Sequence, residues 1–399
     1  MTLKKEEGPF VLTREEAHVP SLEDLPPVAG RHVLVRADLN APLRSKPGGG
    51  YEVADDFRLR SSVPTLQWLR SNGAIVTVCS HLGRPKGRVD PRYAMAPVRE
   101  ALTAMVPEIT VMENLRFDPG EETNDPAFVR RLIDGFDYYV NDAFGACHRN
   151  HASIVGPPAH MPSAAGRLLH REVEVLYGIL IDPARPFVAV VGGAKVADKL
   201  GVLRSLGQRV DHLLLGGAMC FTFLAALGHE VGASRVESEL FGEARSLLGL
   251  HPPPELPSDL IALSPEGELG SSTDPTGAVR PFELDLLPGW QGVDIGPATC
   301  ASFAEVIAGA RTILWNGPMG VFEDARFAMG TRAIAEAVAS CPGFSVVGGG
   351  ETTAALHEFG LEGNIDHIST GGGATLELLE KGDLPGLAAL RASRATQGS

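Results

Sequence analysis

The chain has 399 residues, of which 44% are hydrophobic and 21% are charged, a composition that is typical of a globular protein and excludes a disordered or fibrous one. At roughly 150 residues per domain, this length predicts two hydrophobic cores. The formal net charge of −14 is opposite in sign to the basic surface that nucleic acid requires, so we expect no nucleic-acid partner.

Export and membrane insertion are not expected. The first twenty residues, MTLKKEEGPFVLTREEAHVP, carry acidic side chains where a signal peptide needs an apolar run, and no apolar stretch approaches the roughly 20 residues of a transmembrane helix. The five cysteines are scattered and form no CxxC pair, so we expect reduced thiols. These features predict a cytoplasmic protein with no membrane partner.

Short aliphatic or β-branched runs recur along the chain and predict strands, and most are followed by helical patterns. In chain order the runs are HVLVRADLN (32–40), AIVTVCSH (74–81), ITVMENL (109–115), YYVNDAF (138–144), FVAVVGG (187–193), HLLLGGA (212–218), RTILWNG (311–317), FSVVGGG (344–350) and IDHISTGGG (365–373). Alternating apolar strands and helices predict an α/β fold in which parallel sheets are flanked by helices.

A domain boundary is expected near residues 171–187, where a helical pattern meets Pro183 and Pro186 just before a new strand. We therefore expect one domain over 1–182, a second over 183–380, and a C-terminal segment, 381–399, that returns to the first domain. Residues 1–28 and 251–292 have irregular patterns, and the second of these stretches is expected to hold short strands and a loop.

Polar side chains follow the predicted strands of the first half, where open parallel sheets bind ligands. They are Asp38, Asn40, His81, Arg84, Arg116, His148 and Arg149, and Arg58 could join them from a neighbouring helix start. Several arginines in an acidic protein favour a ligand with phosphate and carboxylate groups, because guanidinium pairs with both. Solvated surface arginines are the alternative, and the two histidines could be structural residues or, less readily given their spacing, metal ligands.

Four Gly-rich turns follow strands in the second half, at Gly192–Gly193, Gly216–Gly217, Gly348–Gly350 and Gly371–Gly373. Glycine lets a phosphate approach the backbone, and the following helix offers free N–H groups, which favours a nucleotide. Lys195 and Lys199 stand at a helical i, i+4 spacing beside the first turn. Each glycine pair could instead only permit a tight turn. The chain has no GxxxxGK[ST] motif and no GxGxxG fingerprint after its first strand, so a P-loop enzyme is excluded and a nicotinamide enzyme loses its best support.

Eight longer motifs occur in order: VRADLNAPL (35–43), SHLGRPKG (80–87), MENLRFDPGEE (112–122), YVNDAFGACHRNHAS (139–153), FVAVVGGAKVADK (187–199), LLLGGAMCFTFL (213–224), ILWNGPMGVFE (313–323) and HISTGGGA (367–374). In these motifs, their order and their spacing, the chain resembles the phosphoglycerate kinase family from about Gly30 to Leu390. The resemblance implies two Rossmann-like lobes joined by a hinge. It also implies a monomeric enzyme that equilibrates 1,3-bisphosphoglycerate and MgADP with 3-phosphoglycerate and MgATP.

The resemblance also implies roles for particular residues, with the acid on the first lobe and the nucleotide on the second. The acid would be held by Asp38, Asn40, Arg58, His81, Arg84, Arg116 and Arg149, with Arg36 and His148 extending the basic patch. The nucleotide would meet Lys195, Lys199, Gly216, Gly217, Asn316, Glu323, Gly349, Gly350, Glu351 and Thr352.

The substrates are already ionised at neutral pH, so catalysis is expected to need positioning and charge stabilisation rather than a general base. Arg58 and Lys199 are assigned to the transferring phosphoryl group, with backbone N–H groups at Gly372 and Gly373, and lobe closure brings the substrates together. A thiol nucleophile at Cys147 is not needed.

One residue departs from the family pattern. The family usually has Asp where this chain has Glu351, the carboxylate assigned to the magnesium ion of the nucleotide. The alternative to an active kinase is therefore a weakly active paralogue that binds nucleotide and phosphoglycerate.

Overall fold

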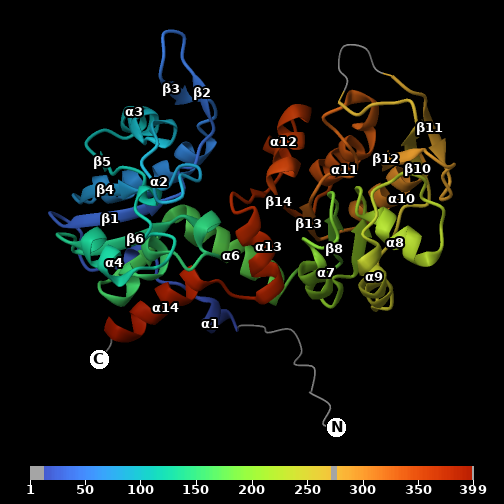
Figure 1. The fold of residues 1–399 in the computed structure, drawn as a ribbon. Helices are drawn as coiled ribbons and strands as arrows, with labels where there is room; N and C mark the ends of the chain where they lie inside the picture. Colours follow the sequence, from blue (N-terminus) through green and yellow to red (C-terminus); the bar gives the residue numbers. More distant parts are fainter. Residues whose placement is uncertain (1–12, 271–275, 398–399) are drawn as a thin grey trace. The chain divides into compact units, whose positions relative to one another are not determined.

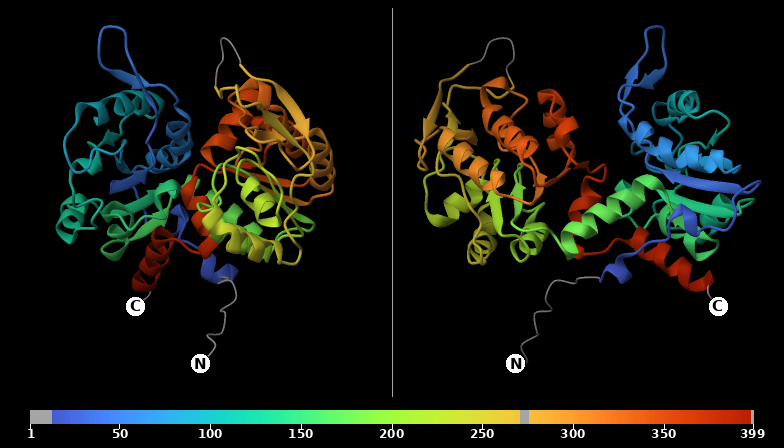
Figure 2. Two further views of the ribbon diagram at one scale, coloured as in Figure 1. Left: turned by 45° about the vertical axis from the view of Figure 1, so that its right-hand side comes forward. Right: turned by 180° about the vertical axis from the view of Figure 1, so that it is seen from behind.

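A computed structural model describes residues 13–270 and 276–397. The chain forms two compact units. Among the described residues, the N-terminal unit comprises 13–177 together with 381–397, and the C-terminal unit comprises 178–270 and 276–380. The division falls inside one helix, α6 (Arg167–Ile181). In each unit a parallel sheet is flanked by helices (Figures 1 and 2).

The sheet of the N-terminal unit has five parallel strands in the order β5-β4-β1-β6-β7. Their bounds are β1 (His32–Ala37), β4 (Ile75–Cys79), β5 (Thr110–Val111), β6 (Tyr138–Asp142) and β7 (Ser163–Ala165). A hairpin, β2 (Leu43–Ser45) and β3 (Tyr51–Val53), lies outside the sheet. The helices are α1 (Arg14–Ala17), α2 (Phe57–Ser71), α3 (Ala96–Met105), α4 (Pro126–Ile133), α5 (Ala152–Val155), the first part of α6, and α14 (Pro385–Gln397).

Helices α2 and α3 lie on one face of this sheet and α4 on the other (Figure 1). A strand covered on both faces has no solvent side, so its residues are buried in succession rather than alternately. Strand β1 follows this rule, because every residue after His32 is buried. The C-terminal helix α14 contacts α5 and β7, and the amide of Gly386 donates to the carbonyl of Cys147 at 2.9 Å.

The C-terminal unit has a second five-stranded parallel sheet, in the order β15-β14-β13-β8-β9. Its strands are β8 (Phe187–Val191), β9 (His212–Leu215), β13 (Thr312–Asn316), β14 (Phe344–Gly348) and β15 (His367–Ile368). A smaller antiparallel sheet contains β10 (Leu260–Leu263), β11 (Val279–Phe282) and β12 (Gln291–Ile295). The helices are α7 (Leu200–Gly207), α8 (Cys220–Leu227), α9 (Phe241–Leu248), α10 (Pro297–Ala308), α11 (Met329–Ser340), α12 (Gly350–Phe359) and α13 (Gly373–Lys381).

All nine predicted runs contain a strand of these two parallel sheets, so the predicted α/β class is confirmed. The helical spacing assigned to Lys195 and Lys199 is wrong. These residues lie in a turn, in which the amide of Lys199 donates to the carbonyl of Val196, and helix α7 begins only at Leu200. Along the described part of the chain, no helix has both the length and the apolar character needed to cross a membrane.

The strand order marks one ligand-binding edge in each sheet. In the N-terminal unit the chain adds β4 and β5 on one side of β1 and then β6 and β7 on the other, so the order reverses between β1 and β6. In the C-terminal unit the reversal lies between β8 and β13. Open parallel sheets bind ligands outside the carboxyl ends of the strands at such points.

Candidate active site

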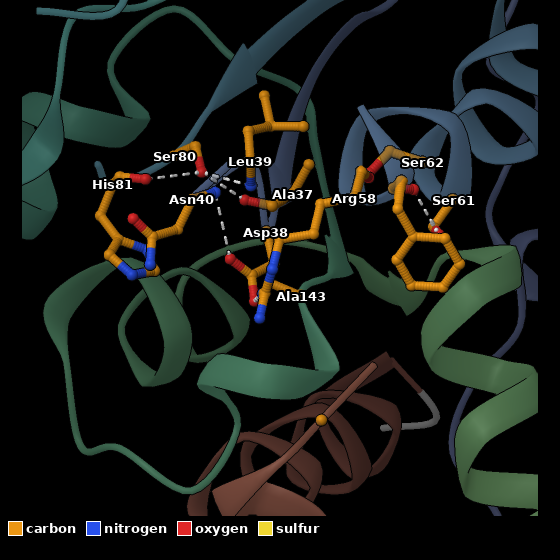
Figure 3. Close-up of polar contacts among 12 residues, drawn as sticks. Ala37, Asp38, Leu39, Asn40, Arg58, Ser61, Ser62, Ser80, His81 and Ala143 are labelled. Carbon is orange, nitrogen blue, oxygen red and sulfur yellow. Dashed lines mark hydrogen bonds and ion pairs between the residues drawn. The ribbon is translucent and has the colours of Figure 1, made fainter. Parts of the chain in front are cut away.

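In the N-terminal unit, the segment that follows β1 is fixed by the segment that follows β4. The Ser80 hydroxyl donates to the carbonyl of Ala37 at 2.7 Å and accepts the amide of Leu39 at 2.9 Å. The Asn40 side-chain oxygen accepts the amide of Gly83 at 2.8 Å. Figure 3 shows Asp38, Asn40, Ser80 and His81 gathered at this edge of the sheet. The two loops therefore form one rigid edge that carries the predicted acid-binding residues.

Arg58 joins this edge from the first turn of α2. It forms an ion pair with the carboxylate of Asp38, and Figure 3 shows the two side chains pointing toward one another. Burial alone would raise the pKa of Asp38, but the charge of Arg58, together with that of Arg36 and the amide of Asn40, holds the pKa below its usual value. Asp38 therefore stays ionised and orients the guanidinium of Arg58.

Arg36 lies beneath this edge, and only 1% of its surface is exposed. Its Nε donates to the Ser153 hydroxyl at 2.9 Å, and its Nη2 lies 3.0 Å from Nδ1 of His81. Burial and the charge of Arg36 hold the pKa of His81 well below its usual value, so the ring is neutral. A guanidinium can only donate, so Nδ1 accepts and the ring proton is on Nε2. Arg36 therefore fixes the tautomer of His81, and its burial removes it from the residues that a ligand could touch.

Further cationic side chains follow three strands of this sheet: Arg84 follows β4, Arg116 follows β5 and Arg149 follows β6. Arg116 is buried; its Nη1 donates to the carbonyl of Gly83 at 2.8 Å and its Nε lies 3.2 Å from the carboxylate of Glu122. Burial, followed by the charges of Arg116 and Arg149, lowers the pKa of His151 to about 4. The local potential is therefore positive although the chain is acidic, which suits an anionic ligand. Arg149 is partly exposed and Arg84 is exposed.

In the C-terminal unit, a cavity of about 390 Å³ opens where the sheet order reverses. It contains seven of the predicted nucleotide-binding residues: Lys195, Lys199, Asn316, Gly349, Gly350, Glu351 and Thr352. The first turn of α12 lines this cavity and presents backbone N–H groups that have no acceptor within the helix. Such a helix start is suited to bind phosphate.

Lys199 and Asn316 form a buried pair in this cavity. The ammonium of Lys199 donates to the Asn316 side-chain oxygen at 2.6 Å and to its carbonyl at 3.0 Å. Burial lowers the pKa of Lys199 to about 8, and the negative charges of Glu351 and Asp198 offset this only in part. Among the residues described, the Asn316 Nδ2 has no hydrogen-bond partner. The pair therefore presents a cation and a free donor where phosphate oxygens would lie.

A second, mostly apolar cavity of about 300 Å³ shares Gly193, Ala194 and Glu351 with the first, so the two are adjacent. Its lining includes Gly217, Phe221, Val293, Met319 and the predicted Glu323. An apolar pocket beside a polar one matches a base beside its phosphates.

Glycine serves mainly for close packing here. A Cβ on Gly217, where φ is +66°, would lie 2.4 Å from the backbone nitrogen of Gly193. The amides of Gly193 and Gly217 donate to the carbonyls of Pro318 and Met319, each at 3.0 Å. These two N–H groups are therefore already used within the protein, whereas the turn that opens α12 offers free ones.

Three of the residues predicted for the C-terminal unit do not line either cavity. They are Gly216, Gly372 and Gly373. Thr352 lines the polar cavity, but its hydroxyl accepts the amide of Gly317 at 2.7 Å. Sequence reasoning missed Asp198, although it lies beside Lys199 in a quoted motif. It also missed Asp294 and Leu269, for which no motif gave a signal.

Two cationic sites at the carboxyl ends of two parallel sheets are what an α/β phosphotransferase with two anionic substrates requires. Comparison with known sequences makes this class specific. The profile of the family described as phosphoglycerate kinase matches residues 22–111 and 104–382. The phosphoglycerate kinase of Rubrobacter xylanophilus is 48% identical over 394 residues, which cover 93% of this chain and 97% of that protein. That of a Parafrankia species is 48% identical and covers 93% and 99%.

Solved structures give the same result. The phosphoglycerate kinase from Coxiella burnetii superposes with a TM-score of 0.83 at 36% identity, covering 94% of this chain and 99% of that one. The phosphoglycerate kinase from Pyrococcus horikoshii gives a TM-score of 0.80 at 31% identity with the same coverage. This chain belongs to the phosphoglycerate kinase family, and the resemblance inferred from its motifs is confirmed.

Proposed function

We propose that the protein is a kinase that transfers a phosphoryl group reversibly between 1,3-bisphosphoglycerate and MgADP, giving 3-phosphoglycerate and MgATP. Membership of the phosphoglycerate kinase family supports the reaction and the use of ATP and ADP. The observation that carries the proposal for this chain is the buried Lys199–Asn316 pair in the polar cavity, because it supplies charge and donors for a polyphosphate.

The phosphoglycerate is assigned to the edge of the N-terminal unit. Asp38 orients Arg58, and Asn40 and Arg116 fix the loop of Gly83 on which His81 and Arg84 lie. Arg149 adds a further cation. Bidentate guanidinium groups suit both the carboxylate and the phosphate of this acid. Its full set of ligands is proposed as Asp38, Asn40, Arg58, His81, Arg84, Arg116 and Arg149.

The nucleotide is assigned to the two adjacent cavities of the C-terminal unit. The base occupies the apolar cavity beside Gly217, with Gly216 supporting the turn and Glu323 near the ribose. The phosphates occupy the polar cavity, where Lys195, Lys199, Asn316, Gly349, Gly350 and Thr352 are the proposed contacts.

The donor set of the polar cavity also fits Mg²⁺. Within the described ranges no three His, Cys, Asp or Glu residues form a metal cluster. Magnesium that travels with a nucleotide needs only one or two carboxylates, because phosphate oxygens and water complete its shell. Glu351 is exposed, lies in the first turn of α12 and lines both cavities, so we assign it to the metal. The ion would neutralise phosphate charge.

The proposed mechanism uses position and charge rather than a general base, because the attacking carboxylate or phosphate is already ionised. Arg58 and Lys199 stabilise the charge on the transferring phosphoryl group, and backbone N–H groups at Gly372 and Gly373 assist. Because the substrates are assigned to different units, the units must close around a hinge to react. We further propose a cytoplasmic monomer without a membrane partner, with the N-terminal lobe over 1–182 and 381–399 and the C-terminal lobe over 183–380.

The test is the magnesium-dependent phosphorylation of 3-phosphoglycerate by ATP, coupled to reduction of the acyl phosphate product, in the native protein and in Glu351→Asp. We expect robust native turnover, a higher magnesium requirement in Glu351→Ala, and activity within a few-fold of native in Glu351→Asp. Native protein that binds ATP but does not turn over, with activity restored by Glu351→Asp, would instead favour a weakly active binding paralogue.

A further inference from the structure

A bidentate ion pair lies next to the apolar cavity of the C-terminal unit. Nε of Arg326 donates to Oδ1 of Asp324 at 2.9 Å, and its Nη2 donates to Oδ2 at 2.6 Å. The Asp324 and Arg326 side chains are 7% and 18% exposed, so this pair is largely shielded from water. Paired guanidinium and carboxylate groups in this geometry are strong and directional.

The pair holds the segment from Glu268 to Gly270, which contributes to one wall of the cavity. Nη2 of Arg326 also donates to the carbonyl of Glu268 at 2.8 Å, and Nη1 donates to the carbonyl of Thr276 at 2.9 Å. The amide of Gly270 approaches Oδ2 of Asp324 at 3.4 Å. Leu269 lies between Glu268 and Gly270, and it lines the cavity.

The same pair holds a second wall. The amide of Asp324 donates to the carbonyl of Val321, and the amide of Val321 donates to the carbonyl of Val293, both at 3.0 Å. Val321, Glu323 and Val293 all line the cavity. The guanidinium also stacks at 4.8 Å over Phe327, which is fully buried against Val293. One ion pair therefore connects two walls that are far apart in sequence.

Leu269 is 42% exposed and lines the apolar cavity. An occupant with an apolar face would cover it and gain from that burial. The base of a purine nucleotide is such an occupant, and it carries no charge that would need a partner here.

We propose that Leu269 is a base-contacting residue and that Asp324 and Arg326 are positioning residues that hold it against the base of a bound purine nucleotide. The inference rests on the proposed nucleotide site and deepens it, by giving a role to part of the irregular stretch 251–292. Arg326 suits this task because its planar fork donates two hydrogen bonds to the carboxylate and one to each of two carbonyls, whereas an ammonium group has only three donors.

The test compares Leu269→Ala, Leu269→Met, Arg326→Met and Arg326→Lys with the native protein. We expect Leu269→Ala and Arg326→Met each to raise both KM and Kd for ATP about five- to ten-fold, since each removes one apolar contact from the base. The value of kcat and the KM for the acid substrate stay within about two-fold, because neither change touches the N-terminal unit. Leu269→Met should bind ATP with native affinity, whereas Arg326→Lys should bind it more weakly. The double variant Leu269→Ala/Arg326→Met should bind ATP no more weakly than Arg326→Met alone.

Inorganic tripolyphosphate separates a base contact from a general disturbance of the site, because it has phosphates and no base. Its inhibition constant should be unchanged in Leu269→Ala and Arg326→Met. The matched control is Arg332→Met, which removes an exposed arginine stacked on Phe359 away from both cavities. It should leave the ATP Kd unchanged.

An unchanged ATP Kd in Leu269→Ala and Arg326→Met would overturn the proposal, even if both variants unfold more easily. Equal weakening of ATP and tripolyphosphate would overturn it too, because the effect would not come from the base. Binding is measured without turnover, so a native protein that binds ATP but fails to phosphorylate 3-phosphoglycerate would refute the proposed reaction and leave this result readable.

Discussion

Each unit has a proposed anion site at the carboxyl end of a parallel sheet, but the two sites are built from different chemical groups. The edge of the N-terminal unit is built from side-chain charges that hold one another, such as Asp38 with Arg58 and Arg116 with Glu122. The polar cavity of the C-terminal unit has one buried cation, Lys199, together with the start of helix α12. A small acid offers few atoms and needs dense charge, whereas a polyphosphate is long enough to be held mainly by backbone donors.

Loss of an arginine from the charge-built edge should have the largest effect. Arg58→Ala removes the cation assigned to the transferring phosphoryl group and leaves Asp38 ionised without its partner. We expect kcat to fall by about 10³ or more, since a single arginine at a phosphoryl transition state contributes on the order of 10³ to 10⁵. The coupled assay with 3-phosphoglycerate and ATP measures this.

Arg60→Ala is the matched control for Arg58→Ala. Arg60 lies on the same helix, is exposed and pairs with Asp56 across one turn, a kind of pair that contributes little. Its kcat should stay near native. A loss below ten-fold in Arg58→Ala would contradict the role assigned to that residue and with it the contrast between the two sites.

The buried cation of the polar cavity, Lys199, should make nucleotide binding sensitive to alkali. The pKa of Lys199 is lowered to about 8, so its charge is lost as the pH rises through that value, whereas an ordinary lysine stays charged to about 10.4. We expect kcat/KM for ATP to fall above about pH 8 in the native protein. At pH 7, we expect kcat/KM for ATP in Lys199→Met to be about 10²-fold lower than in the native protein. Rates from pH 6 to 10 at saturating 3-phosphoglycerate measure both.

Lys199→Arg keeps its charge throughout this range, so its alkaline decline should disappear whatever its absolute rate. Lys195→Met, in which an exposed lysine of the same cavity is removed, should keep the decline. An unchanged alkaline limb in Lys199→Arg would show that another group titrates and that Lys199 is not the charge on which this site depends.

The contrast also explains what could be predicted from sequence. Asp38 and His81 were found because each follows an apolar run, and a parallel sheet brings such ends to one edge. Asn316 was assigned only from the resemblance to the family. The Lys199–Asn316 bond joins residues 117 apart, and only the pairing of β8 with β13 creates it. The hydrogen bonds from Arg326 to Glu268 and Thr276 had no local signal at all. The helical spacing of Lys195 and Lys199 misled because the turn after β8 delays the start of α7.

Each unit also contains one buried aspartate at a strand end that accepts amides from a helix start. Asp142, at the end of β6, accepts the amides of Leu168 and Leu169 in α6 at 3.0 and 3.3 Å. Asp294, in β12, accepts the amide of Gly330 in α11 at 2.6 Å. In this respect the units are alike, since burial raises the pKa of both carboxyls to about 7.

The raised pKa values of Asp142 and Asp294 determine how the free energy of unfolding changes with pH. Between about pH 4 and 7 each carboxyl is protonated in the folded chain and ionised in the unfolded one, so the free energy of unfolding falls as the pH rises and levels off above about 7. We expect each carboxyl to account for about 2 kcal/mol of this fall between pH 5 and 7. Asp142→Asn and Asp294→Asn cannot titrate and should each lose that share, whereas Asp134→Asn, at an exposed helix end, should not. Urea unfolding followed at several pH values measures the free energy of unfolding against pH. Where the two units unfold in separate steps, Asp142→Asn should alter this pH dependence for the N-terminal unit, and Asp294→Asn should alter it for the C-terminal unit. A native slope retained in both variants would mean that the helix-start amides keep these carboxylates ionised in spite of burial.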